Sequence, residues 1–316
     1  MPDDAELFHR DAHNPLLTAS DWPYSMNSVF NPAAALHDGD TVLLNRVEDR
    51  RGVSHLTVAR SADGRTKWRI DSKPLIADDP TDPTSCWGVE DARITYVEEL
   101  GGYVIAYTAY GPSGPCVALA ITEDFSAAEP LGVVMPPEDK NASLLPRRVD
   151  GYFVLFHRPV SVISARADVW LSRSADLRSW TTPEPVMQAR PGSWWDAARI
   201  GMGPPAIETP AGWLTAYHGV KQMVSTAIYR VGLVLLDLEQ PTRVLRRTPT
   251  WVLGPHEPYE VVGDVPNVIF PTGLVHDPST DELRLYYGAA DTCVAMAYTN
   301  MNEVLDYMLS LPPEQA

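Results

Sequence analysis

The chain has 316 residues, of which 45% are hydrophobic, and its formal net charge is −16. Such an acidic chain lacks the basic stripe that binds nucleic-acid phosphates, and its charge opposes an anionic membrane surface. No segment approaches the ~20 apolar residues of a membrane span, residues 1–10 hold no apolar leader, and Cys86, Cys116 and Cys293 lack CxxC spacing. We therefore expect a cytoplasmic protein without a disulfide framework or a zinc site.

Short runs of β-branched and aromatic residues, separated by turn residues, occur along the whole chain and are typical of an all-β protein. In chain order they are residues 41–44, 103–107, 117–121, 152–156, 169–172, 213–217, 231–236 and 283–287. Helical spacing occurs only at residues 302–311, where four apolar residues share one face. Residues 1–25 are expected to form an arm that either caps the fold or mediates assembly into a homo-oligomer.

A weak repeat underlies these runs. An acidic or amide residue follows a strand-like run about every sixty residues, which indicates a series of similar units. These residues are Asp63, Asp124, Asp176, Asp237 and Asn300. Five units with several strands each predict a five-bladed β-propeller, a single domain over residues 1–316 with a short C-terminal helix. The alternative is a β-sandwich in which the turns coincide by chance.

In a propeller the inner strand of each blade lines a central channel, so polar residues at the strand entrances would converge on one site. In chain order the candidates are Asn31, Arg46, Glu90, Asp91, Arg93, Lys140, Arg158, Arg199, His218, Asn267 and Asp291. One pocket would then hold a pair of carboxylates beside a cluster of cations. Trp87, Trp194 and Trp195 either stack on a sugar or pack between blades, and for Trp195 we favour packing.

This combination suggests cleavage of a glycosidic bond. The reaction needs an acid that protonates the leaving oxygen and a nucleophile on the opposite face of the sugar, usually supplied by a second carboxylate. Phosphate is already anionic and needs no base, but the protein must then supply cations, for which arginine is well suited. Such cations lie beside apolar strands at Lys140, Arg158, Arg199 and His218. The other interpretation pairs each of them with a nearby acid as a structural ion pair.

Several motifs, taken in order, resemble glycoside hydrolase family 130, which contains mannoside phosphorylases and related β-mannosidases. They are Val29-Phe30-Asn31-Pro32-Ala33, Leu44-Asn45-Arg46-Val47, Glu90-Asp91-Ala92-Arg93-Ile94-Thr95, His157-Arg158-Pro159, Trp194-Trp195-Asp196, Tyr217-His218-Gly219-Val220, Pro266-Asn267-Val268-Ile269-Phe270-Pro271 and Tyr286-Tyr287-Gly288-Ala289-Ala290-Asp291. The resemblance covers nearly the whole chain and implies a five-bladed propeller, in agreement with the repeat.

The resemblance also implies roles for the site residues. Asp91 would be the general acid, its proton relayed through the 3-hydroxyl of the bound mannose, and Glu90 would raise the pKa of this acid while Arg93 would lower it. The implied phosphate-binding residues are Lys140, Arg158, Arg199, His218 and Tyr229, and the implied sugar-binding residues are Asn31, Arg46, Glu90, Arg93 and Asp291. Phosphate would be a co-substrate. No other cofactor is implied, and the histidine and acid spacings match neither a zinc motif nor a calcium loop.

We therefore expect an inverting β-mannoside phosphorylase that converts a β-linked manno-oligosaccharide and inorganic phosphate into α-mannose 1-phosphate and a shortened saccharide. One alternative is an inverting β-mannosidase that uses Glu257 or Glu260 to activate water, and another is a sugar-binding propeller without catalysis. The linkage (β-1,2 or β-1,4) and the acceptor sugar depend on loops such as residues 71–86 and 160–168, and the sequence leaves both open.

Overall fold

The computed structural model describes residues 6–160 and 167–314, which form β-sheets and two short α-helices. The first sheet has the order β2 (Ser28–His37), β3 (Asp40–Glu48), β4 (Ser54–Ser61), β6 (Gly88–Val97), β7 (Gly102–Gly111), β8 (Gly114–Thr122) and β9 (Glu129–Met135), with β5 (Arg69–Ile70) paired to β4. The second has the order β10 (Asp139–Leu144), β11 (Phe153–Pro159), β12 (Val169–Ser174) and β13 (Glu184–Met187). The third has the order β14 (Arg199–Met202), β16 (Gly212–Gln222), β17 (Ala227–Leu236) and β18 (Val244–Arg247), with β15 (Ile207–Thr209) paired to β16. The fourth has the order β1 (His9–Arg10), β21 (Cys293–Asn300), β20 (Glu282–Ala289) and β19 (Ile269–Asp277).

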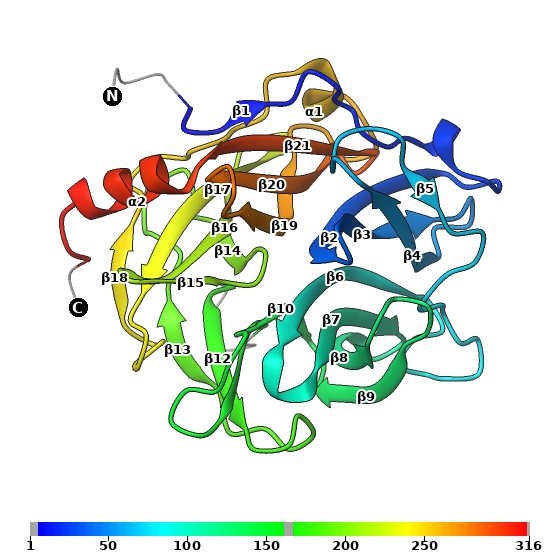
Figure 1. Cartoon of the computed structure of the whole chain (residues 1–316), viewed down its shortest axis with the longest axis horizontal. Helices are drawn as coiled ribbons and strands as arrows, with labels where there is room; N and C mark the ends of the chain where they lie inside the picture. The colour runs from blue at the N-terminus through cyan, green and yellow to red at the C-terminus, as the bar shows by residue number, and fades with distance from the viewer. Residues whose placement is uncertain (1–5, 161–166, 315–316) are drawn as a thin grey trace.

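The sheets are arranged around a common centre, next to which lie β2, β6, β10, β14 and β19 (Figure 1). Strand β2 contacts both β6 and β19, and β10 contacts both β6 and β14. The first sheet is divided in its middle, because β4 and β6 are joined only through the parallel pair Ser54 and Gly88. All other strand pairs within the four sheets are antiparallel.

The N-terminal segment completes the sheet that contains the last strands of the chain. His9 pairs with Tyr298 and Arg10 pairs with Ala297, so β1 lies on β21 (Figure 1). Arg10 also forms an ion pair at 2.8 Å with the buried Glu260. Part of the expected arm at residues 1–25 is therefore an edge strand of the fold, and residues 1–5 lie outside the described residues.

The hydrophobic core is divided into five clusters, each located between neighbouring groups of strands. Each cluster joins apolar side chains that alternate along strands facing one another, as expected for packed sheets. One pair from each cluster is Leu44 with Ile105, Val104 with Leu155, Val154 with Trp213, Leu233 with Leu285, and Leu43 with Met296. The packing thus runs around the centre and leaves the inner strands free to present polar groups to it.

The predicted elements agree well with the observed ones. The eight predicted runs fall on β3, β7, β8, β11, β12, β16, β17 and β20, and the helix predicted at residues 302–311 is α2 (Met301–Ser310). The other helix, α1 (Pro258–Val261), has one turn and is too short to show a helical period in the sequence. None of the helices within the described ranges is both long and apolar enough to cross a bilayer.

The repeated acidic residues have a local structural reason. Asp63, Asp124, Asp176 and Asp237 follow β4, β8, β12 and β17, and each carboxylate accepts a hydrogen bond from the backbone N–H two residues later. This is the Asx-turn geometry that Asp favours at the ends of strands. Asn300 differs, because it is the N-cap position of α2. The repeat in the sequence therefore marks the same turn in successive groups of strands.

Candidate active site

Three of the strands next to the centre carry the same irregularity. The pairing register of β2, β6 and β10 shifts at a β-bulge, and the bulged residues include Asn31 (φ 48°), Asp91 (φ 51°) and Asn141 (φ 58°). Asn and Asp adopt this left-handed conformation more readily than other residues with a side chain. A bulge also re-aims the side chain that it carries. The backbone thereby turns two amides and one carboxylate toward the same space.

These three side chains line a cavity of about 280 Å³. The other residues that line it are Arg46, Lys140, Arg158, Arg199, His218, Tyr229, Val265, Val268, Phe270 and Asp291. Of the predicted catalytic, phosphate-binding and sugar-binding residues, all except Glu90 and Arg93 therefore lie at this cavity. The further candidate Asn267 does not line the cavity, and its carbonyl accepts a hydrogen bond of 3.0 Å from the N–H of Tyr229, which does.

Asp91 is held by two neighbours on one side of the cavity. Its Oδ1 accepts a hydrogen bond of 2.8 Å from Nδ2 of Asn31 and lies 3.2 Å from Nη1 of Arg46. Burial acts to raise the pKa of Asp91, but the positive charges of Arg46 and Arg93 and the Asn31 hydrogen bond outweigh it, so the pKa is lowered. The group is consequently a carboxylate at neutral pH in the protein alone.

Arg93 and Glu90 do not line the cavity but contact residues that do. Arg93 is fully buried, and its guanidinium donates to the backbone carbonyl of Asp91 at 2.7 Å and to that of Gly203 at 2.6 Å. Arg93 therefore binds the backbone of the bulge, and the Asp91 carboxylate forms its ion pair with Arg46. Glu90 lies 3.3 Å from Nη2 of Arg46, and burial raises its pKa despite that cation.

Asp291 approaches the same space from the turn between β20 and β21. Burial raises the pKa of Asp291 to about 7, and the negative charge of Asp91 adds to the effect. The folded protein therefore holds a proton on Asp291 between pH ~4 and ~7, where the unfolded chain has already lost it. Folding stability is fully present below that window and falls as pH rises through it.

We expect the substitution Asp291→Asn to flatten this part of the stability profile. The free energy of unfolding of the wild type should fall by a few kcal/mol more than that of the variant between pH 4 and pH 8. Urea unfolding at half-unit pH intervals measures the difference. Parallel profiles for the two proteins would show that Asp291 titrates normally.

The opposite side of the cavity is cationic. Nη1 of Arg158 donates to Nε2 of His218 at 3.4 Å, and Arg199 donates to the hydroxyl of Tyr229 and has its guanidinium 5.5 Å from the centre of that ring. Within residues 6–160 and 167–314, none of Lys140, Arg158 and Arg199 forms an ion pair. The interpretation of these side chains as structural ion pairs is therefore not supported.

The charge on this side is carried by the lysine and the two arginines. Burial lowers the pKa of Arg158 to about 10, and the neighbouring Arg199 acts in the same direction. Burial, followed by the charges of Arg158 and Arg93, lowers the pKa of His218 well below its usual value. His218, which the sequence had grouped with the cations, is thus a neutral hydrogen-bonding group here.

Several buried polar atoms around the cavity have no hydrogen-bond partner among the described residues. Such groups are costly unless a ligand or water satisfies them. They are Oδ1 of Asn31, Nδ2 and Oδ1 of Asn141, Nε of Arg158 and Nδ1 of His218. Their number at one place indicates a polar ligand that both donates and accepts hydrogen bonds.

Four residues that line the cavity were missed by the sequence interpretation, namely Asn141, Val265, Val268 and Phe270. Asn141 follows the predicted Lys140, and its signal is the Asn-Ala pair at the same strand entrance as Asn31-Pro32 and Asp91-Ala92. Phe270 has its ring 4.6 Å from that of His218 and carries no polar signal that could have marked it as a wall of the cavity.

The two rival catalytic acids do not line the cavity. Glu260 is fully buried and accepts hydrogen bonds from Arg10 at 2.8 Å, from the Tyr287 hydroxyl at 2.8 Å and from the backbone of His256 and Glu257. Glu257 begins α1, and its side chain lies 3.1 Å from His256. Both carboxylates therefore serve the connection between the N-terminal strand and α1.

We expect Glu260→Gln to affect stability and not chemistry. Losing the charge that Arg10 and Tyr287 bind should lower the free energy of unfolding by about 1.5–3 kcal/mol. Denaturant unfolding measures this loss, and kcat should stay at the wild-type value in the folded variant. A fall in kcat without a loss of stability would indicate that Glu260 is a catalytic group.

The three predicted tryptophans lie elsewhere. Trp195 is 5% exposed, donates to the carbonyl of Pro249 at 3.0 Å and packs against Tyr217, which agrees with its predicted packing role. Trp87 packs edge-on against Tyr110 and is half-exposed, as is Trp194. None of these indoles lines the central cavity.

The sequence of this chain matches a family model and several known proteins. The model of glycoside hydrolase family 130, described as beta-1,4-mannooligosaccharide phosphorylase, matches residues 10–310. Beta-1,4-mannooligosaccharide phosphorylase of Ruminococcus albus is 34% identical over 305 residues, which cover 94% of this chain and 89% of that protein. Beta-1,2-mannobiose phosphorylase of Listeria innocua is 35% identical over 253 residues, which cover 80% of this chain and 68% of that protein.

Solved structures of proteins from the same family are also similar to this chain. The complex of the Listeria innocua beta-1,2-mannobiose phosphorylase with beta-1,2-mannobiose has a TM-score of 0.87 and 28% identity, covering 96% of this chain and 99% of that chain. Another structure, described with glycoside hydrolases of this family that target beta-1,2 mannosidic linkages in Candida mannan, has a TM-score of 0.82 and 27% identity over 96% of both chains. This protein belongs to glycoside hydrolase family 130.

Proposed function

We propose that this protein is an inverting phosphorylase of β-mannosides. An oxygen of inorganic phosphate attacks the anomeric carbon of a terminal β-mannosyl unit, and the bond from that carbon to the bridging oxygen breaks. Asp91 supplies the proton that the leaving sugar takes up, with the 3-hydroxyl of mannose as its relay. The products are α-mannose 1-phosphate and a saccharide that is one unit shorter.

The observation that carries this proposal is the unpaired cationic side of the cavity. Lys140, Arg158 and Arg199 line the cavity together with Asp91, and none of them has a carboxylate partner among the described residues. These side chains are partly buried, where cations without a partner are costly, and a phosphate dianion would compensate them through charge-assisted hydrogen bonds. A hydrolase, whose nucleophile is water, gains nothing from this arrangement.

Binding of phosphate also supplies what Asp91 needs to act as an acid. The cations around the cavity lower the pKa of this carboxyl in the protein alone. A bound dianion offsets their charge and adds negative charge nearby, and both effects raise the pKa. Protonation of Asp91 would thus be favoured only when phosphate is present, which couples the acid to its nucleophile.

Product analysis tests the proposal. β-1,2- and β-1,4-mannobiose are incubated with the enzyme, with and without inorganic phosphate, and the sugars are separated by chromatography. Phosphate-dependent release of α-mannose 1-phosphate from either linkage is the expected result, and comparing the two linkages identifies the substrate. Release of free mannose at equal rates in both conditions would assign a β-mannosidase instead, and no turnover of either would point to a sugar-binding propeller.

Two further proposals concern the molecule as a whole. We propose that the first sheet counts as two blades, β2–β5 and β6–β9, so that the fold is a five-bladed propeller; the single parallel pair between β4 and β6 supports this division. We also propose a cytoplasmic location, which is supported by the free thiols of Cys86, Cys116 and Cys293.

A further inference from the structure

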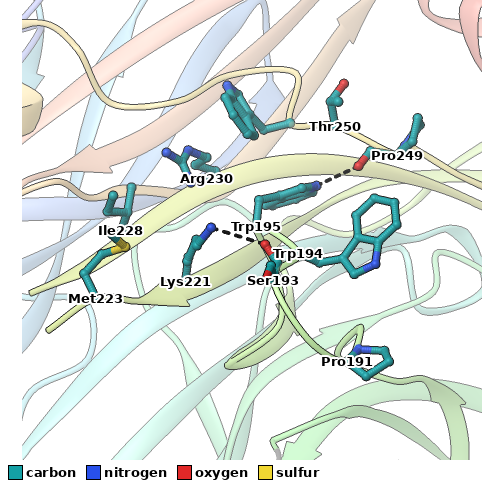
Figure 2. A pocket seen from close by; sticks show the side chains of 11 residues that line it. Pro191, Ser193, Trp194, Trp195, Lys221, Met223, Ile228, Arg230, Pro249 and Thr250 are labelled. Carbon is teal, nitrogen blue, oxygen red and sulfur yellow. Dashed lines mark hydrogen bonds between the residues drawn. The ribbon is translucent and has the colours of Figure 1, made fainter.

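A second cavity, of about 570 Å³, lies on the other face of the hairpin formed by β16 and β17 (Figure 2). Side chains alternate between the two faces of a strand. On β17, Tyr229 lines the central cavity, while its neighbours Ile228 and Arg230 line the second one. The two cavities are therefore separated by a single layer of hairpin.

Aromatic side chains form much of the second cavity. Trp194 is 46% exposed and Trp251 is 40% exposed, and Trp195 lies between Trp194 on one side and Lys221 and Arg230 on the other (Figure 2). Apolar contacts are added by Pro191, Met223, Ile228 and Pro249. Arg190 lies over the Trp194 ring at 5.0 Å and Arg230 lies over the Trp251 ring at 4.1 Å, so an arginine covers one face of each indole. The other face of each is suited to the C–H face of a sugar ring, which binds by stacking.

The floor of this cavity is rigid. A Cβ atom on Gly219 would lie 2.4 Å from the Trp195 ring, and one on Gly232 would lie 2.8 Å from it, so two glycines make room for the indole. The next residue, Asp196, is fully buried and binds Arg247 at 2.6 Å and Arg190 at 3.1 Å. The loop that carries Trp194 and Trp195 is thus fixed before any ligand arrives.

The two charged groups of the second cavity, Lys221 and Arg230, are cations, and the polar groups beside them are Ser193 and Thr250. Lys221 lies opposite Ile228 in the hairpin and Arg230 lies opposite Gly219, so the two cations are diagonal neighbours on one face, about 7–8 Å apart at the backbone. Lys221 donates to the carbonyl of Ser193 at 3.2 Å, and Arg230 stacks on Trp251 at 4.1 Å. Stacking leaves the N–H edges of the guanidinium free.

No acidic residue lines this cavity, although the chain carries 41 acids and 25 lysines and arginines. Within the described part of the chain, neither Lys221 nor Arg230 forms an ion pair. Burial lowers the pKa of Arg230, and no carboxylate opposes the effect. Sites for neutral sugars need acceptors for hydroxyl groups, whereas a pair of unpaired cations needs an anion.

We propose that this cavity is a second binding site for a phosphorylated hexose. The sugar ring stacks on the indoles of Trp194 and Trp251, and the phosphate lies between Lys221 and Arg230. The choice of a hexose phosphate rests on the proposed function, because α-mannose 1-phosphate is then formed on the opposite face of the same hairpin. Rebinding of product there would bring it within one side-chain layer of Tyr229.

Calorimetric titration of the full-length enzyme with α-mannose 1-phosphate tests this site. The wild type should bind two equivalents in phosphate-free buffer. Arg230→Gln and Trp251→Ala should weaken one of them by about tenfold or more and leave the other unchanged. The matched control Arg243→Gln removes an arginine that is 67% exposed outside the cavity and should behave as the wild type.

In the complementary variant Arg158→Gln, binding of α-mannose 1-phosphate at the central site should be lost and binding at the second site should remain. A change in tryptophan fluorescence reports binding at the second site. Mannose and inorganic phosphate, added separately, should each bind the second site more weakly than the intact hexose phosphate. Binding of only one equivalent of α-mannose 1-phosphate by the wild type would overturn the second site. So would binding of two equivalents whose affinities do not change in Arg230→Gln and Trp251→Ala. A parallel assay of phosphorolysis separates the two proposals. If the enzyme turns over substrate but binds only one equivalent of α-mannose 1-phosphate, only the second site is overturned. If it binds two equivalents but turns over no substrate, only the proposed reaction is overturned.

Discussion

Replacing Asp91 with asparagine is expected to lower kcat for phosphorolysis of β-mannobiose by about 10²–10⁴-fold, the usual contribution of a general acid. The substitution removes the carboxyl group that supplies the proton and keeps the shape of the side chain. Asparagine tolerates the left-handed backbone at this position and can still accept the hydrogen bond from Asn31. Arg46 keeps Glu48 and Glu90 as partners, each at 3.3 Å, so the fold should persist. Release of mannose 1-phosphate measures kcat, and thermal unfolding confirms folding.

A second substrate distinguishes an acid from a residue that only positions the sugar. An aryl β-mannoside with a good leaving group needs little protonation, so Asp91→Asn should lose much less activity on it than on mannobiose. Equal losses on the two substrates would assign Asp91 to positioning. An unchanged kcat on mannobiose would place the acid elsewhere in the cavity.

Replacing Arg158 with glutamine is expected to have opposite effects on stability and on activity. The KM for phosphate should rise roughly 10–100-fold, because a charge-assisted contact to the nucleophile is lost. The phosphate-free protein should become more stable by about 1–3 kcal/mol, because burial and Arg199 lower the pKa of Arg158 to about 10 and thus disfavour its charged form in the fold. Added phosphate should stabilise the wild type strongly and the variant weakly.

Arg247 provides the matched contrast. It is also buried, but its guanidinium lies 2.6 Å from the carboxylate of Asp196. Arg247→Gln should therefore destabilise the protein, because the buried carboxylate of Asp196 loses the shorter of its two ion pairs and keeps only Arg190, at 3.1 Å. Urea unfolding of both variants in phosphate-free buffer gives the comparison. If Arg158→Gln destabilised the protein as Arg247→Gln does, the cationic cluster would be part of the structural framework and not a site kept for an anion.

Much of the fold was predictable because its signals are local. The apolar and aromatic runs at residues 103–107 and 283–287 follow from strands whose side chains are mostly buried, and the repeated Asp63 and Asp176 follow from the turn that each closes. Helix α1 was missed, because a single turn that begins at Pro258 has no period to detect.

The site was predictable in its residue types and less so in its contacts. Asp91 and Arg93 are two residues apart in the sequence, yet the Asp91 carboxylate pairs with Arg46 from β3, and Arg93 binds the backbone carbonyl of Asp91 instead. The neutral state of His218 depends on burial among cations from separate sheets, which no local pattern records. Asn141 was missed because the Asn-Ala pair that accompanies its bulge is too short a signal to identify a site residue by itself.

The repeated bulge also limits how this site can change during evolution. At Asn31, Asp91 and Asn141 the backbone accepts few residues with side chains other than asparagine and aspartate, and these two differ by one atom group and often by a single nucleotide. Each position is therefore close to a binary choice between a neutral amide and an acid. An amide and a carboxylate can therefore be exchanged on any of three strands around the site while the backbone stays the same.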